Sequence, residues 1–132
     1  MKYSFSLILI IGIGMVNAAV AGDTSPSAQL KYWTDIAGAA ANPVAGKLFF
    51  TQTHGKEWSC ASCHGNPPLN TGKHASTNKA IPSLAPSSNP EAFTETTKIE
   101  KWFRRNCNDV LARECTPQEK ANVLAYLISL TK

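Results

Sequence analysis

The sequence lacks several features that would assign the protein to a class from composition alone. Its formal net charge is +4 over 132 residues, and no block of like charge is longer than Arg104-Arg105. Nucleic acid is therefore not the expected partner. No strand pattern and no internal repeat occurs, which excludes sheet-based and repeat architectures. After residue 21 no second long apolar run follows, so we expect the remainder to form one domain without a membrane span.

The apolar run at the N-terminus has the form of a signal peptide. Residues 5–16 make a run of about 12 residues, well short of the roughly 20 that span a bilayer. The small residues Ala19-Val20-Ala21 follow it and match the pattern at which signal peptides are cleaved. We therefore predict a signal peptide over residues 1–21, with cleavage after Ala18 or Ala19 as the alternatives, and a mature domain over residues 22–132. Export to the periplasm would place the cysteines in an oxidising compartment.

Four segments carry the signals of helices. Ser25-Pro26 and Asn42-Pro43 each combine an N-cap residue with a proline at the first helical position. A third helix is predicted over residues 94–105, and a fourth begins at the capping box Thr116-Pro117-Gln118-Glu119. Residues 54–89 are rich in Gly, Pro, Ser, Asn and Thr, and so long an irregular stretch in a small domain must wrap around something. The sequence therefore predicts an all-α fold with helices at both ends and long irregular loops.

The motif Cys60-Ala61-Ser62-Cys63-His64 indicates a specific chemistry. Thiols three positions apart can bond to the two vinyl groups of a haem, and the adjacent imidazole can then ligate the iron from the proximal side. A thioredoxin-like CxxC would need a surrounding βαβ pattern, and a zinc site would need a second close cysteine pair, whereas Cys107 and Cys115 have seven residues between them. We therefore predict one haem c, covalently bound through Cys60 and Cys63, with His64 as the proximal ligand.

The residues alone leave the distal ligand open. Both methionines, Met1 and Met15, lie in the predicted signal peptide, so ligation by histidine and methionine is excluded. His54 lies just before the motif, where little chain is left to reach the opposite face of a haem. His74 lies in a polar loop and is the better histidine candidate. Ligation by His74 would make the protein a bis-histidine electron carrier.

The second cysteine pair constrains the end of the third helix if its members are bonded. On one continuous helix their Cα atoms would be about 12 Å apart, whereas a disulfide needs roughly 4.4–6.8 Å. In that case we expect the helix to end near residues 106–108 and residues 109–114 to loop back. The bond would then fix the backbone of the two asparagines that flank Cys107. Alternatively, the disulfide would only stabilise a small exported domain.

Three stretches of the mature chain resemble the class I cytochrome c fold. They are NPVAGKLF at residues 42–49, the CxxCH motif followed by Gly65, and Ala125-Tyr126-Leu127 in the predicted last helix. This resemblance implies that the helix containing residues 42–49 and the predicted last helix cross over the haem edge, with Gly46 meeting the aromatic side chain of Tyr126.

A closer resemblance is to the sphaeroides haem protein (SHP) family of small class I cytochromes c. It is carried by WFRRNCN at residues 102–108, RECTP at residues 113–117, EKA at residues 119–121, DTSP at residues 23–26 and the proline-containing stretch 80–87. In that family an asparagine side chain is the sixth ligand of the oxidised haem, next to a disulfide. The resemblance therefore implies Asn106 as the distal ligand and a disulfide between Cys107 and Cys115.

A weak distal ligand has a functional consequence. Ferric iron tolerates a neutral amide oxygen better than ferrous iron does, so reduction should release Asn106 and open a coordination site. The resemblance implies binding of oxygen, nitric oxide and similar diatomics, with electrons supplied by a dihaem cytochrome c. We expect a ligand-binding and electron-transfer protein rather than a turnover enzyme, although terminal reduction of oxygen or nitric oxide would also fit.

Basic residues and a proline complete the candidate set. Lys98, Lys101 and Arg105 follow helical spacing, so they could dock an acidic redox partner, bind a haem propionate, or simply be solvated. Pro82 is one of four prolines that could supply a carbonyl to the proximal imidazole.

Overall fold

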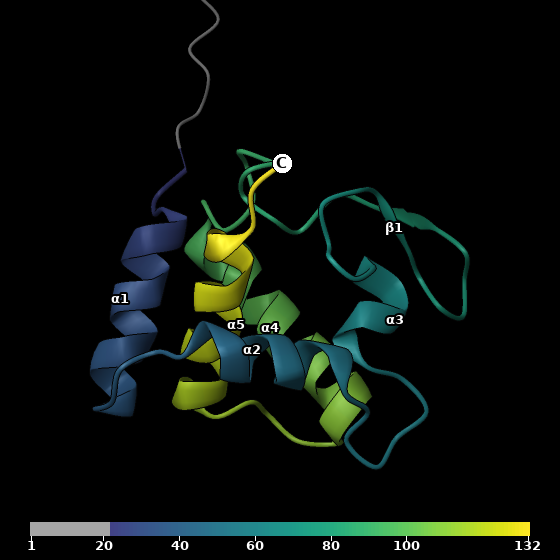
Figure 1. The fold of residues 1–132 in the computed structure, drawn as a ribbon, viewed down its shortest axis with the longest axis horizontal. Coiled ribbons are helices and arrows are strands. Elements are labelled where there is room, and N and C mark those ends of the chain that lie inside the picture. The colour runs from purple at the N-terminus through teal and green to yellow at the C-terminus, as the bar shows by residue number, and fades with distance from the viewer. Residues whose placement is uncertain (1–21) are drawn as a thin grey trace, which may run out of the picture.

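The computed structural model describes residues 22–132, so the predicted signal peptide lies outside the described residues. The chain order is α1 (Pro26–Ala37), α2 (Pro43–Thr51), α3 (Cys60–His64), β1 (Gly72–Lys73), β2 (Ala80–Ile81), α4 (Thr96–Leu111) and α5 (Pro117–Ser129). The strands form a two-residue antiparallel ladder with Gly72 opposite Ile81, which the all-α prediction did not include. Helices form the rest of the architecture, as predicted (Figure 1). No helix within residues 22–132 is long and apolar enough to cross a membrane.

The first two helices begin where the caps and prolines predict. The Ser25 hydroxyl accepts the N–H of Ala28 at 3.2 Å, and the Asn42 side-chain oxygen accepts the N–H groups of Val44 and Ala45 at 2.9 and 3.1 Å. Each cap satisfies backbone donors that have no partner inside the helix. Helix α1 then ends at Gly38, which is left-handed with φ 67°.

Helices α2 and α5 cross in direct backbone contact. A Cβ at Gly46 would collide with the carbonyl oxygen of Asn122, so only glycine fits at the crossing. One turn further along both helices, the rings of Phe50 and Tyr126 pack with centroids 5.7 Å apart. The contact therefore differs in detail from the prediction. The backbone of Asn122 lies closest to Gly46, and the ring of Tyr126 packs on Phe50.

Helix α4 is longer than the sequence predicts, and this corrects the expected end at residues 106–108. The helix continues to Leu111 and ends at Ala112, which adopts the left-handed conformation with φ 58°. The chain therefore reverses four residues later than expected. Asn106 lies inside the regular helix instead of at its end.

The disulfide forms across this reversal. Cys107 and Cys115 are bonded, with Cα atoms 5.5 Å apart. The left-handed turn at Ala112 brings the two cysteines together, so the separation of a straight helix does not apply. The bond joins the last turn of α4 to the residue before the N-cap of α5.

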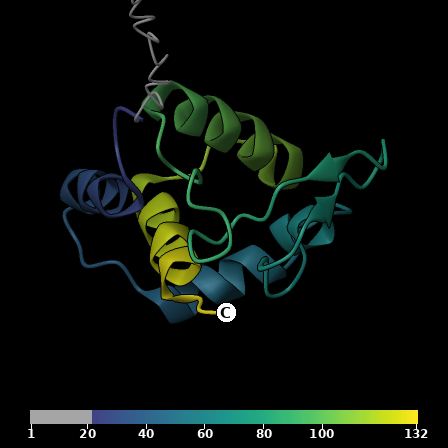
Figure 2. The same cartoon turned by 90° about the horizontal axis from the view of Figure 1, so that it is seen from above.

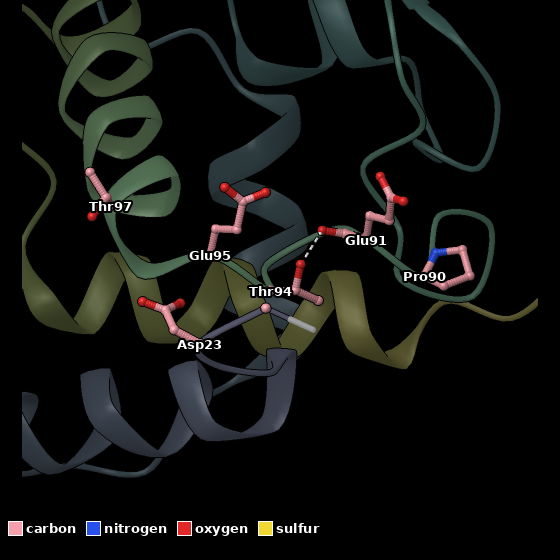
Figure 3. Close-up of a pocket in the computed structure, with 7 residues that line it drawn as sticks. Asp23, Pro90, Glu91, Thr94, Glu95 and Thr97 are labelled. Atoms are coloured by element: carbon pink, nitrogen blue, oxygen red, sulfur yellow. Dashed lines mark hydrogen bonds between the residues drawn. The ribbon is translucent and has the colours of Figure 1, made fainter. Parts of the chain in front are cut away.

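The beginning of α4 depends on residues far away in the sequence. Its N-cap Glu95 makes no side-chain cap, and the N–H of Thr96 instead donates to a carboxylate oxygen of Asp23 at 2.8 Å. The N–H of Thr24 also donates to the carbonyl of Thr94 at 3.2 Å. Figure 3 shows Asp23 beside the first turn of α4, at a cavity of about 600 Å³ that Glu91 also lines.

The core lies where α1 and α2 pack on α5. Its most deeply buried large side chains are Phe50, Leu124 and Leu127, and Trp33 of α1 packs on the same side of α5 as Leu124. Seen from above, α4 runs along one side of the molecule, while α2 and α3 lie on the other side (Figure 2). Helix α4 reaches the core through Phe103.

Candidate haem site

A cavity of about 950 Å³ is lined by residues of α2, α3, the β1–β2 loop and α4. The predicted site residues that line it are Cys60, Cys63, His64, His74, Asn106, Cys107 and Cys115. Helices α3 and α4 lie on opposite sides of the molecule (Figure 2), and both contribute residues to the lining of the cavity. The structure therefore brings the residues of the two sequence motifs together.

Helix α3 presents the CxxCH motif in a fixed conformation. Ser59 and Ser62 form a capping box, in which the Ser59 hydroxyl accepts the N–H of Ser62 at 3.3 Å and the Ser62 hydroxyl accepts the N–H of Ser59 at 3.0 Å. Both Cys60 and Cys63 are free thiols and half-buried. Burial raises the pKa of the Cys60 thiol to about 11, so this thiol is not a stabilised thiolate of the kind that redox dithiols use.

The zinc alternative is not supported, because no group of three or more His, Cys, Asp or Glu side chains within residues 22–132 is placed to hold a metal ion. Cys107 and Cys115 are joined to each other and have no thiolate to offer a metal. The two cysteines of α3 remain as a separate pair.

His64 has an unpaired nitrogen on the wall of this cavity. Its Nδ1 is buried and has no hydrogen-bond partner among the described residues, and burial lowers the pKa of the ring so that it is neutral at pH 7. The carbonyls of Pro67 and Pro68 accept bonds from their own loop. Pro82 lines the cavity, but no carbonyl within residues 22–132 accepts a hydrogen bond from Nδ1 of His64.

The residues present fit a covalently bound haem. Two free thiols and a neutral imidazole lie on one wall of a cavity whose lining is mainly apolar. The backbone closes tightly behind them, because a Cβ at Gly72 would collide with the carbonyl oxygen of Cys63. Basic side chains line the same cavity and could neutralise carboxylates of a bound group, namely Lys79, Lys98 and Arg105.

The two histidine candidates for the distal side are engaged elsewhere. The backbone N–H of Thr77 donates to Nδ1 of His74 at 3.3 Å, so in the neutral ring the proton lies on Nε2 and removes the lone pair that iron would need there. Nε2 of His54 bonds to the carbonyl oxygen of Phe49 at 2.8 Å, and His54 does not line the cavity. Asn106 is half-buried in α4 and faces the cavity.

An ion pair that the sequence motifs did not reveal joins the turn enclosed by the disulfide to the first turn of α5. Arg113 donates two hydrogen bonds to Glu119, at 2.8 and 2.7 Å, and Glu119 also accepts the N–H of the N-cap Thr116 at 2.8 Å. The capping box identified Glu119 in advance, but its partner depends on the turn after α4. Hydrogen bonding to Arg113 holds the pKa of Glu119 below its ordinary value.

Replacing Glu119 by glutamine is expected to reduce stability most at neutral pH. Because the folded pKa of Glu119 is lowered, its contribution is present above the unfolded value of about 4.3 and is lost as the pH falls through the folded value. We expect a loss of about 0.5 kcal/mol at pH 7, since the pair is partly exposed, and a difference near zero at the acidic end. Urea unfolding of both proteins between pH 7 and pH 3 measures this, with Asp35→Asn, which breaks the exposed pair with Lys31, as the control. A difference that does not change with pH would contradict the assignment.

A helical fold with two thiols and an imidazole on one wall of a largely apolar cavity defines a class I c-type cytochrome. The model of a domain of unknown function, DUF1924, matches residues 36–127. The chain is 44% identical over 123 residues to cytochrome c-type protein SHP of Cereibacter sphaeroides, which covers 90% of this chain and 95% of that protein. It is also 41% identical over 139 residues to cytochrome c'' of Methylophilus methylotrophus, covering 96% of this chain and 95% of that protein. The chain belongs to the SHP family.

Solved structures of these relatives confirm the fold. The structure of oxidised SHP, described as an oxygen-binding cytochrome c, superposes with a TM-score of 0.78 at 42% identity, over 83% of this chain and 100% of that chain. Crystalline oxidised cytochrome c'' of Methylophilus methylotrophus superposes with a TM-score of 0.74 at 42% identity, over 81% of this chain and 95% of that chain. A solution structure of the same protein, whose description concerns haem-ligand detachment, gives 0.71 over 81% and 94%.

Proposed function

We propose that the protein is a periplasmic monohaem cytochrome c that binds a diatomic ligand such as oxygen or nitric oxide after reduction. In this proposal Cys60 and Cys63 attach the haem through thioether bonds, His64 is the proximal ligand and Asn106 is the distal ligand of the ferric state. Residues 1–21 act as the signal peptide and residues 22–132 as the haem domain. The haem supplies an iron that changes oxidation state and takes up an exogenous ligand.

The position of Asn106 is the observation that carries the proposal. Its side chain is half-buried, lines the cavity and comes from the helix opposite α3. An amide oxygen is a neutral, hard donor, so it suits ferric iron better than ferrous iron. A regular helix and the neighbouring disulfide restrict where this weak ligand can move. Reduction would then free Asn106 and leave a position for a gas molecule.

Two descriptions of relatives support this assignment. SHP is described as an oxygen-binding cytochrome c, and the solution study of cytochrome c'' concerns detachment of a haem ligand. By family resemblance the electron donor is a dihaem cytochrome c. The proposed role is ligand binding with electron transfer, without a committed turnover reaction.

A bis-histidine electron carrier is the alternative, and the hydrogen bonds of His74 oppose it. Coordination through Nε2 would require the ring to give up its bond from the N–H of Thr77 or to lose both nitrogen protons. Coordination through Nδ1 would replace that bond directly. Either route removes a contact that holds the loop, whereas Asn106 reaches the cavity from a regular helix.

Spectra of the ferric and ferrous holoproteins test the proposal. In wild type we expect a low-spin ferric form, and a high-spin ferrous form that binds carbon monoxide readily. Asn106→Ala is expected to lose most of the ferric low-spin signal and to keep carbon monoxide binding. His74→Ala is expected to match wild type, because its side chain is not a ligand in this proposal.

The opposite set of spectra would contradict the proposed function. A wild-type ferrous protein that stays low-spin and resists carbon monoxide, together with a His74→Ala variant that loses the low-spin signal, would establish the bis-histidine carrier. Haem that separates from the chain on denaturation would contradict attachment through Cys60 and Cys63.

A further inference from the structure

The surface around Trp102 combines exposure with access to the cavity. Large apolar side chains that are exposed in the described residues are Tyr32, Ile36, Val44, Leu48 and Trp102. Of these, Trp102 alone also lines the candidate haem cavity. Its side chain is 43% exposed, so one aromatic residue connects the solvent with the interior of the site.

Two cations flank this tryptophan. The Lys101 ammonium and the Arg105 guanidinium each lie 5.5 Å from the centroid of the Trp102 ring. Both side chains are exposed, and no described carboxylate forms an ion pair with either of them. Their charges are therefore available to a partner, while cation–π attraction keeps them close to the ring.

The positively charged surface around Trp102 ends near Lys98 along α4. Lys98, which the sequence grouped with Lys101 and Arg105, is paired with Glu95 at 2.6 Å. Beyond it, Asp23, Glu91 and Glu95 line the smaller cavity at the beginning of the helix (Figure 3). One end of the exposed helix is thus acidic and its middle is basic. A partner with an acidic face would be attracted to the middle and repelled at the end, which favours one orientation.

We propose that an acidic electron-donor protein docks on the Trp102 surface, defined as Lys101, Trp102 and Arg105. Tryptophan and arginine are the residues that most often dominate binding energy at protein interfaces. Carboxylates of the donor would pair with the two cations while an apolar group packs on the exposed ring. This inference rests on the proposed function, since it identifies where the electrons enter. One electron passes from the reduced centre of the donor to the ferric haem, and no atom or proton is transferred.

Stopped-flow reduction of the ferric holoprotein tests the surface. The probe is flavodoxin hydroquinone, an acidic one-electron donor. We expect Lys101→Glu to lower the second-order rate constant about 5-fold at low ionic strength and to approach wild type at high ionic strength. Arg105 is left unchanged in this test because it also lines the haem cavity. The matched control, Lys47→Glu, changes the net charge equally at an exposed position of α2, and we expect it to stay within about 2-fold of wild type.

A second donor separates charge effects from changes in the haem. Hexaammineruthenium(II) is a small cation, so the same Lys101→Glu variant should be reduced faster by it than wild type at low ionic strength. Rates that change in the same direction with both donors would mean an altered haem and overturn the proposal. Equal flavodoxin rates for the surface variant and its control would also overturn it. Carbon monoxide binding by the reduced variants reports on the proposed function separately.

Discussion

Replacing Gly46 by alanine is expected to destabilise the protein by about 3 kcal/mol, at the upper end of the usual range for overpacking. The added Cβ would collide with the carbonyl oxygen of Asn122, and backbone atoms cannot move aside by a change of rotamer. Helices α2 and α5 would have to separate. Alanine has the higher helix propensity, so any loss of stability comes from the crossing and not from α2 itself.

The same substitution should also disturb the candidate haem site. Helix α2 carries Phe50 one turn after Gly46, and the Phe50 ring lies 6.3 Å from the ring of His64, centroid to centroid. The Asn122 side chain, on the other side of the crossing, accepts the N–H of Asn42 at 2.7 Å. A shift of α2 would therefore change the packing around His64 and weaken the cap of α2.

Chemical unfolding of the holoprotein, followed by circular dichroism, measures the effect. The matched control is Gly38→Ala, because Gly38 has φ 67° but nothing within 4 Å of an added Cβ. It should cost about 1 kcal/mol from backbone strain alone. A loss in Gly46→Ala no larger than that in Gly38→Ala would show that the crossing opens at little cost and that close approach does not require Gly46.

Local signals predicted the starts of three helices, because those starts depend on nearby residues. Ser25 and Asn42 cap their own helices, and Thr116 with Glu119 forms the capping box expected from four consecutive residues. Helix α4 was predicted less well at both ends. Its first N–H is capped by Asp23, 73 residues away in the sequence, and its end depends on Ala112 adopting a left-handed conformation that alanine seldom adopts.

The residues of the candidate site were also predicted unevenly from the sequence. The CxxCH motif is a contiguous stretch on one short helix, so the sequence was sufficient to predict that Cys60, Cys63 and His64 lie together. The distal candidates came from distant segments, and the residues alone ranked His74 above His54 but could not decide between His74 and Asn106. The ranking depends on hydrogen bonds such as that from the N–H of Thr77 to His74. This bond joins residues only three apart, but it depends on the turn in the loop after β1, which no motif in the sequence predicted.

Removing the disulfide, by Cys107→Ala/Cys115→Ala, is expected to lower the free energy of unfolding by about 2.5 kcal/mol. The estimate follows from the closed loop of nine residues in the chain-entropy model. Both cysteines are buried, so loss of their sulfur atoms adds a packing cost. Unfolding of the ferrous wild type with and without a thiol reductant separates these effects, since reduction breaks the bond but keeps both sulfur atoms. Wild-type stability unchanged by the reductant would show that the bond contributes little.

The coordination of the haem should respond differently from stability. Asn106 lies inside α4, which continues to Leu111, so the helix positions its backbone even when the bond to Cys115 is absent. We therefore expect the ferric spectrum of the double variant to match wild type at low temperature and to lose its low-spin signal only as the protein begins to unfold. Spectra recorded from 5 °C upward, beside those of Asn106→Ala, test this. A double variant that resembles Asn106→Ala at every temperature would mean that the disulfide, and not the helix, holds the ligand in place.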